Sequence, residues 1–133
     1  MIMAVTVTVK QNKGTHSIAT ARTHKVDVDR VAEKGGTDIG AMGGELFLMG
    51  IGGCFMSNLV AAIDARDLDV KELSVDVVAE VAEKPARFSD IELRVSGQYT
   101  DEKEMKKLIT IAERGCISSN TVRGGANLKT ILV

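Results

Sequence analysis

The sequence predicts an α+β protein in which antiparallel strands surround one long buried helix. Three observations support this: alternating apolar residues in the first thirty positions, an uncharged run of 18 residues from Leu46 to Ile63, and a second alternating stretch followed by an amphipathic segment. A period of two is typical of half-buried strands, and a period near 3.6 is typical of helices. The expected order is βββ-α-ββ-α-β, in a single domain covering residues 1–133.

The first thirty residues predict an antiparallel meander. Valines alternate with threonines over residues 5–9, close to the start at Met1, and residues 11–14 have the composition of a turn. His16–Arg22 and Lys25–Asp29 are expected to form two further short strands. The glycines between residues 35 and 44 then predict a flexible loop.

The uncharged run Leu46–Ile63 has two interpretations. Eighteen residues without a charge reach the lower limit of length for a transmembrane helix. Several small and polar residues dilute the run, and the rest of the chain has the composition of a soluble protein; these residues are Gly50, Gly52, Gly53, Ser57 and Asn58. We therefore expect a helix that is buried on most sides in a soluble protein, and no membrane insertion.

The second half predicts a hairpin, a helix and a closing strand. Leu73–Glu83 and Phe88–Tyr99 alternate as strands, joined near the only proline, Pro85. Thr100 is the expected N-cap of the helix that follows, and Gly115 its expected end. The residues with helical spacing between them are Met105, Leu108, Ile109 and Ala112. Asn127–Val133 is expected to close the fold as a strand.

Composition limits the possible functions. The chain has 17 basic and 18 acidic residues, a balance that argues against a nucleic-acid partner. Two cysteines and two histidines without compact spacing do not predict a metal site, and no cofactor motif is present. The start of the chain lacks a charged leader, so we expect a cytoplasmic protein, where cysteines are more often free or redox-active than permanently bridged.

Cys54 lies in the middle of the uncharged helix. Small or polar residues share its helical face: Gly50, Ser57, Asn58 and Ala61. One interpretation is a core thiol without chemistry, since free cysteines are often buried. The other is a reactive thiol that a second backbone can approach closely.

Cys116 follows Gly115, and residues 117–123 are compatible with one or two further helical turns. A cysteine at a helix N-terminus is favoured as thiolate, and Arg114 and Arg123 could add to this. The alternative is an N-cap residue with no chemistry. Two thiols on separate elements could form an attacking and resolving pair, in which a sulfenic acid on one condenses with the other.

Two segments carry a resemblance to a known family. Gly44–Phe55 (GELFLMGIGGCF) and Ala112–Asn120 (AERGCISSN) resemble the two cysteine motifs of the OsmC/Ohr family, osmotically inducible protein C and organic hydroperoxide resistance protein. The resemblance implies an intertwined homodimer with the long helices buried between subunits. It also implies reduction of organic hydroperoxides, and less efficiently of hydrogen peroxide, with Cys54 peroxidatic, Cys116 resolving, and a dithiol or lipoylated protein as reductant.

Two departures from the family pattern concern the groups around Cys54. The peroxidase branches carry an arginine in the early strands, whereas here the candidates are Lys13, Arg22 and Arg30. The only candidate for the family's glutamate is Glu45, nine residues before Cys54 and one residue closer to it than the glutamate of the hydroperoxide branch. Nine residues along one helix span about 13–14 Å and half a revolution.

Glu45 could therefore act only across a dimer, on the partner's thiol. The alternative is a first-turn acid that suits the helix dipole. These departures leave open a second function, an OsmC-like redox-sensing or ligand-binding dimer without efficient peroxidase activity.

Overall fold

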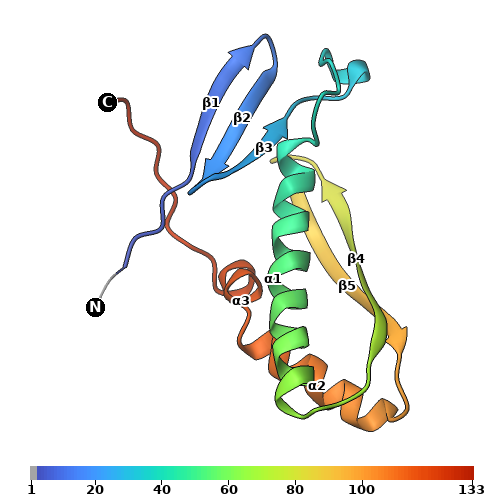
Figure 1. Cartoon of the computed structure of the whole chain (residues 1–133). Helices are drawn as coiled ribbons and strands as arrows, with labels where there is room; N and C mark the ends of the chain where they lie inside the picture. The colour runs from blue at the N-terminus through green and yellow to red at the C-terminus, as the bar shows by residue number, and fades with distance from the viewer. Residues whose placement is uncertain (1–2) are drawn as a thin grey trace. The chain divides into compact units, whose positions relative to one another are not determined.

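The computed structural model describes residues 3–133, and the chain divides into two compact units, one up to Phe47 and the other from Leu48 to Val133 (Figure 1). The boundary falls inside helix α1, Gly43–Ala65. Antiparallel sheets combined with helices confirm the predicted α+β class. That the whole chain forms one domain stays a prediction.

The first unit contains a three-stranded antiparallel sheet in the order β1-β2-β3, drawn in blue in Figure 1. Its strands are β1 (Thr8–Lys13), β2 (His16–Ala21) and β3 (His24–Val28), so the predicted meander is confirmed. Strand β1 starts later than the predicted residue 5. Thr8 pairs with Thr20, and β2 ends one residue later at Ala21, so the residues before Val7 extend beyond their partner strand. Residues 1 and 2, which belong to the stretch predicted as a meander, lie outside the described residues.

The loop after β3 is held by one carboxylate, which the prediction of a flexible loop overlooked. Asp29 is buried, and its carboxylate accepts hydrogen bonds from the hydroxyls of Thr15 (2.6 Å) and Thr37 and from three backbone amides. These bonds, with that of the Thr15 hydroxyl first, hold the pKa of Asp29 well below its usual range. The carboxylate thus ties the loop up to Ile39 back onto the sheet.

We predict that Asp29→Asn lowers the thermal midpoint by several degrees at pH 7, because the amide cannot accept all these hydrogen bonds. A depressed pKa in the folded state stabilises the fold above the unfolded pKa of about 4, and this contribution is lost as the pH falls below it. The difference in midpoint between wild type and variant should therefore shrink in acid. Asp38→Asn in the same loop is the control, and a pH-independent difference would contradict the assignment.

The second unit packs the rest of α1 against a hairpin and two short helices (Figure 1). The hairpin is formed by β4 (Lys71–Ala82) and β5 (Arg87–Gln98), and the helices are α2 (Glu102–Arg114) and α3 (Ile117–Gly124). As predicted, alternate side chains of the hairpin face the core. Val75 and Val95, for example, lie opposite each other on the two strands and both pack against the buried cluster. The buried cluster consists of Phe55, Leu59, Ala62, Ile63, Met105, Leu108, Ala112 and Cys116.

Helix α1 lies close to the hairpin at a glycine. A Cβ added at Gly52 would come within 2.9 Å of Cγ2 of Val77, so a larger residue would push helix and strand apart. Helix α1 is long and apolar enough to cross a membrane by length and composition. One side of the helix, with Ile51, Phe55 and Leu59, is buried within the chain. Only 28% of its apolar window is buried in the described residues, so burial on most sides stays a prediction.

Two predicted details of the second half are wrong. The N-cap of α2 is Asp101 instead of Thr100, because the Asp101 carboxylate accepts a hydrogen bond from the amide of Glu104 at 3.1 Å. Residues 126–133 form no strand. A strand requires a neighbour for its backbone hydrogen bonds, and in the described chain this tail has none, so Leu128 and Leu132 remain 93% and 100% exposed.

Candidate active site

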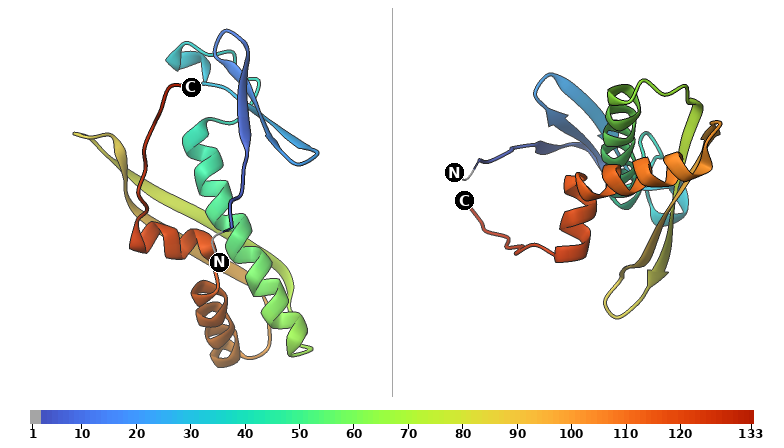
Figure 2. Two further views of the ribbon diagram at one scale, coloured as in Figure 1. Left: turned by 90° about the vertical axis from the view of Figure 1, so that its left-hand side faces the viewer. Right: turned by 90° about the horizontal axis from the view of Figure 1, so that it is seen from below.

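The two cysteines meet where α2 turns into α3. Helix α2 ends at Gly115, as predicted, and Cys116 is the N-cap of α3. Figure 2 shows the chain turning from α2 into α3, in orange to red. The amide of Cys116 donates to the carbonyl of Glu113 at 3.2 Å, and its carbonyl accepts from the amide of Asn120 at 3.0 Å. This corner fixes the direction in which the first amides of α3 point.

Two asparagine side chains hold the corner from either side. Nδ2 of Asn120 donates to the carbonyl of Arg114 at 3.1 Å, and Nδ2 of Asn58 donates to the carbonyl of Ala112 at 3.5 Å. These carbonyls belong to the last turn of α2, where intrahelical partners run out. Asn58 lies one turn after Cys54 on α1, so its hydrogen bond ties the helix of one cysteine to the corner that carries the other.

The sulfur of Cys54 faces the N-terminus of α3. It accepts hydrogen bonds from the amide of Ser118, the hydroxyl of Ser118, the thiol of Cys116 and the amide of Ile117. The Ser118 amide is the largest cause that holds the pKa of the Cys54 thiol below its ordinary value, while burial opposes it. A lowered pKa raises the fraction of thiolate at neutral pH, and the thiolate is the nucleophile.

The helix N-terminus therefore acts on a different cysteine from the one expected. The sequence predicts that the start of this helix favours the thiolate of Cys116, but the amides of α3 point at Cys54. In the described chain, neutral donors lower the pKa of Cys54. The sequence predicts a role for Arg114 and Arg123 beside Cys116 instead, and that role stays a prediction. The guanidinium of Arg123 pairs with the Glu113 carboxylate.

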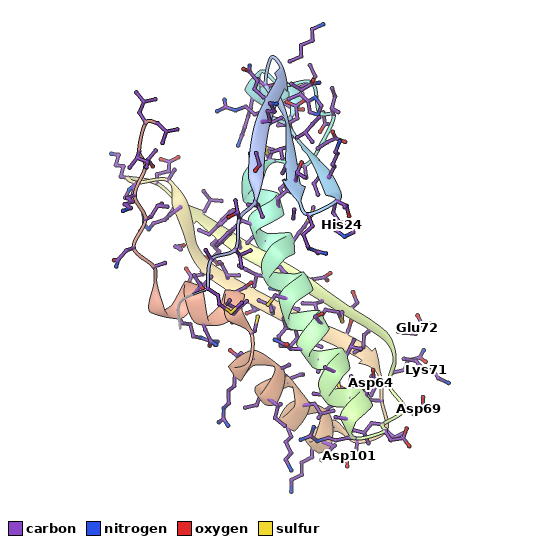
Figure 3. The ribbon with its side chains drawn as sticks, turned by 60° about the vertical axis from the view of Figure 1, so that its left-hand side comes forward. His24, Asp64, Asp69, Lys71, Glu72 and Asp101 are labelled. Carbon is purple, nitrogen blue, oxygen red and sulfur yellow. The ribbon has the colours of Figure 1, made fainter. Side chains whose placement is uncertain are left out.

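The two thiols differ in access to solvent. Cys54 is partly exposed, whereas Cys116 is fully buried, and both are free thiols. Figure 3 draws sulfur in yellow and shows several sulfur atoms between α1 and α3. A peroxide arriving from solvent reaches Cys54 more easily than Cys116.

The other predicted site residues belong to the first unit. Glu45 accepts a hydrogen bond from the amide of Met42, just before α1, at 2.8 Å. This contact is the reciprocal half of a capping box, so Glu45 stabilises the start of its own helix. Lys13 ends β1, and Arg22 and Arg30 follow β2 and β3. The contribution of any of these residues to Cys54 stays a prediction.

Ser118 is the residue that sequence analysis missed. Its position two residues after an N-cap is a signal, because the first amides of a helix lack intrahelical partners. Only the fold brings Cys54 opposite these amides.

Two small hollows lie along β5 beside α3, with volumes of about 180 and 260 Å³. Both are lined by Ile91, Leu93, Ser119 and Arg123. Among residues 3–133, no three His, Cys, Asp or Glu side chains gather as a metal site.

We predict that Ser118→Ala raises the pKa of Cys54, because it removes the hydroxyl bond but keeps the amide. Alkylation of Cys54 by iodoacetamide at pH 7 should then slow several-fold, and the rate profile should shift to higher pH. Ser96→Ala, at an exposed serine of β5, is the control. An unchanged rate profile would show that the Ser118 hydroxyl does not lower the pKa of Cys54.

The site therefore combines a partly exposed thiol at a helix N-terminus with a second, buried thiol that donates a hydrogen bond to it. This arrangement on an α+β fold is typical of a thiol protein in which two cysteines act together. The model of the family described as OsmC-like protein matches residues 34–131. The chain therefore belongs to the OsmC-like family, as the cysteine motifs predict. No protein with a curated description matches it.

Solved structures share the fold at low sequence identity. An OsmC-like protein from Mycoplasma pneumoniae is 18% identical over 94% of this chain and 91% of its own, with a TM-score of 0.81. An organic hydroperoxide resistance protein from Elizabethkingia anophelis is 21% identical over 94% and 91%, with a TM-score of 0.72. A putative organic hydroperoxide resistance protein from Vibrio cholerae, with captopril bound in one of the active sites, is 19% identical over 94% and 89%, with a TM-score of 0.65.

Proposed function

We propose that this protein is a thiol peroxidase that reduces organic hydroperoxides, and less efficiently hydrogen peroxide, through Cys54 and Cys116. The observation that carries the proposal is the sulfur of Cys54, which accepts hydrogen bonds from the N-terminus of α3 and from the Cys116 thiol. Lowered pKa, partial exposure and a neighbouring thiol are the properties required of a peroxidatic cysteine.

The first step is attack by the Cys54 thiolate on the O–O bond. The terminal peroxide oxygen, as OH, is transferred to sulfur, which becomes a sulfenic acid. The alkoxide leaves and takes up a proton to become the alcohol. The amides of Ile117 and Ser118 keep the sulfur in position during attack.

In the second step the Cys116 sulfur attacks the sulfenic acid. The S–O bond breaks, the Cys54–Cys116 disulfide forms and water leaves. Cys116 already contacts Cys54, so little movement is needed. A dithiol or lipoylated protein then reduces the disulfide by two successive exchanges and is itself oxidised to a disulfide.

The proposal includes a homodimer with α1 buried between subunits. Gly50, Gly53, Ser57 and Ala61 recur at helical spacing on α1 and are exposed in the single chain. A Cβ at Gly50 or Gly53 would meet nothing within 4 Å, so the chain's own packing does not require glycine there. Small residues allow a second backbone to approach closely, and that approach explains why these four exposed positions of α1 are small.

We predict that Gly50→Leu converts the dimer to a monomer. The single chain has room for the side chain, and leucine favours a helix over glycine by up to about 1 kcal/mol, so the fold should persist. Light scattering would measure the mass. Gly124→Leu also enters open space and is expected to leave the dimer intact. A monomeric wild type, or a variant that stays dimeric, would contradict the proposed interface.

The dimer is also the setting in which Glu45 is proposed to act. By orienting a cation, one of Lys13, Arg22 or Arg30, toward the partner's Cys54, it would support the thiolate from the other chain. Glu45→Gln tests this, because it should slow peroxide reduction if the carboxylate orients a cation, whereas a purely local cap would alter only stability.

The test of the function itself is peroxide loss with tert-butyl hydroperoxide and dithiothreitol. Turnover that exceeds one peroxide per chain supports the proposal. No consumption would instead favour a redox-sensing or ligand-binding dimer. We place the protein in the cytoplasm, where thiols stay reduced between turnovers.

A further inference from the structure

The solvent face of α2 carries a line of positive charge. Lys103, Lys107 and Arg114 are exposed and lie four and seven residues apart, which places them on one side of the helix. Thr110 lies between them on the same face. The opposite face is formed by Met105, Leu108 and Ala112, which are buried. We call Lys103, Lys107 and Arg114 the basic stripe.

The charges of the basic stripe are not neutralised within the described chain. None of the three takes part in an ion pair within residues 3–133. The three acids of α2 pair with other cations: Glu102 with Lys106 at 3.8 Å, Glu104 with Arg66 at 3.9 Å, and Glu113 with Arg123. The chain as a whole has a net charge of −1, so this face is more positive than the chain as a whole.

Negative charge gathers at another place in the same unit. Asp64, Asp69 and Asp101 lie around the C-terminal end of α1 and the start of α2 (Figure 3). The first turn of α2 therefore carries both signs, because Lys103 of the stripe lies beside Asp101, whereas Lys107 and Arg114 lie further along the helix. A protein with an acidic surface would be attracted most to Lys107 and Arg114, because the acids of the first turn offset Lys103.

The basic stripe leads to the thiols. Arg114 is two residues before Cys116, and the stripe covers about 16 Å of helix before it. An alkyl hydroperoxide is neutral and gains nothing from a row of cations. The substrate that must arrive after each disulfide forms is the reductant.

We propose that the basic stripe is the docking face for an acidic protein that presents the reducing dithiol. This inference rests on the proposed function and adds the kind of partner to it. One thiolate of the dithiol attacks the Cys54 sulfur, the more exposed of the two, and Cys116 leaves as a thiolate that takes up a proton. The second thiol then displaces Cys54 and closes the carrier's disulfide, so two electrons pass to the protein.

The test measures reduction of a preformed disulfide, so it does not depend on peroxidase activity. The protein is oxidised with diamide, and return of free thiols is followed with three reductants: dithiothreitol, a glutamate-rich peptide carrying dihydrolipoyl-lysine, and its lysine-rich counterpart. We expect the acidic peptide to react faster than the basic one, by roughly tenfold, with a rate that falls as salt is added.

The variant Lys103→Glu/Lys107→Glu should remove this preference and leave the dithiothreitol rate unchanged. Lys25→Glu/Lys10→Glu, at exposed strand lysines, is the charge-matched control. Equal rates for the two peptides, or a loss with dithiothreitol as well, would overturn the docking face. So would stripe-dependent binding of DNA or anionic vesicles without any peptide preference. Failure to form the disulfide would count against the proposed function instead.

Discussion

Replacing Cys54 by serine is expected to lower kcat/KM for tert-butyl hydroperoxide by at least about a thousandfold. A serine hydroxyl stays protonated at neutral pH, so the donors that stabilise the Cys54 thiolate have no anion to act on. Peroxide loss with dithiothreitol as reductant gives the rate.

The fold should survive this change, because Cys54 is partly exposed and serine is close in shape. The thermal midpoint is therefore the control, and it should stay within a few degrees of wild type. If Cys54→Ser retained more than a tenth of the activity with an intact fold, the peroxidatic thiol would have to be elsewhere.

Replacing Cys116 by alanine is expected to separate the two steps. The variant should still react with about one peroxide per chain, but its turnover through a disulfide is lost. Sulfenic acid on Cys54 should accumulate and be trapped by dimedone, which mass spectrometry detects. The first reaction should also slow at pH 7, because the lost thiol removes one of the bonds that lower the pKa of Cys54.

Stability needs a separate control here, since Cys116 is fully buried in the core. Removal of its sulfur leaves a small cavity that costs on the order of 1 kcal/mol. Far-UV circular dichroism and the thermal midpoint identify a fold that is weakened but intact. Undiminished turnover in such a fold, with no sulfenic acid trapped, would show that Cys116 does not resolve.

Much of the fold could be predicted because its elements obey local rules. The alternation in β4 and β5 and the helical spacing in α2 each reflect one face turned toward the core. Gly115 ended α2 as expected. The closing strand was wrong for a complementary reason: the pattern of residues 127–133 suits a strand, but a strand also needs a neighbour, which no local pattern supplies.

The candidate site could be predicted only in part for the same reason. The motifs indicated both cysteines, and Cys116 does lie at a helix start. The packing of α1 against the corner decides which sulfur accepts hydrogen bonds from the first amides of that helix. In this fold the acceptor is the sulfur of Cys54. Ser118 was missed because its partner is 64 positions away in the sequence.

Peptide mapping after one equivalent of tert-butyl hydroperoxide, without reductant, tests the pairing of Cys54 and Cys116 most directly. The account predicts a single disulfide between the two, formed within one chain even when isotopically heavy and light chains are mixed. A Cys54 oxidised to sulfinic acid beside a free Cys116, or a bridge between two Cys54 residues, would contradict it.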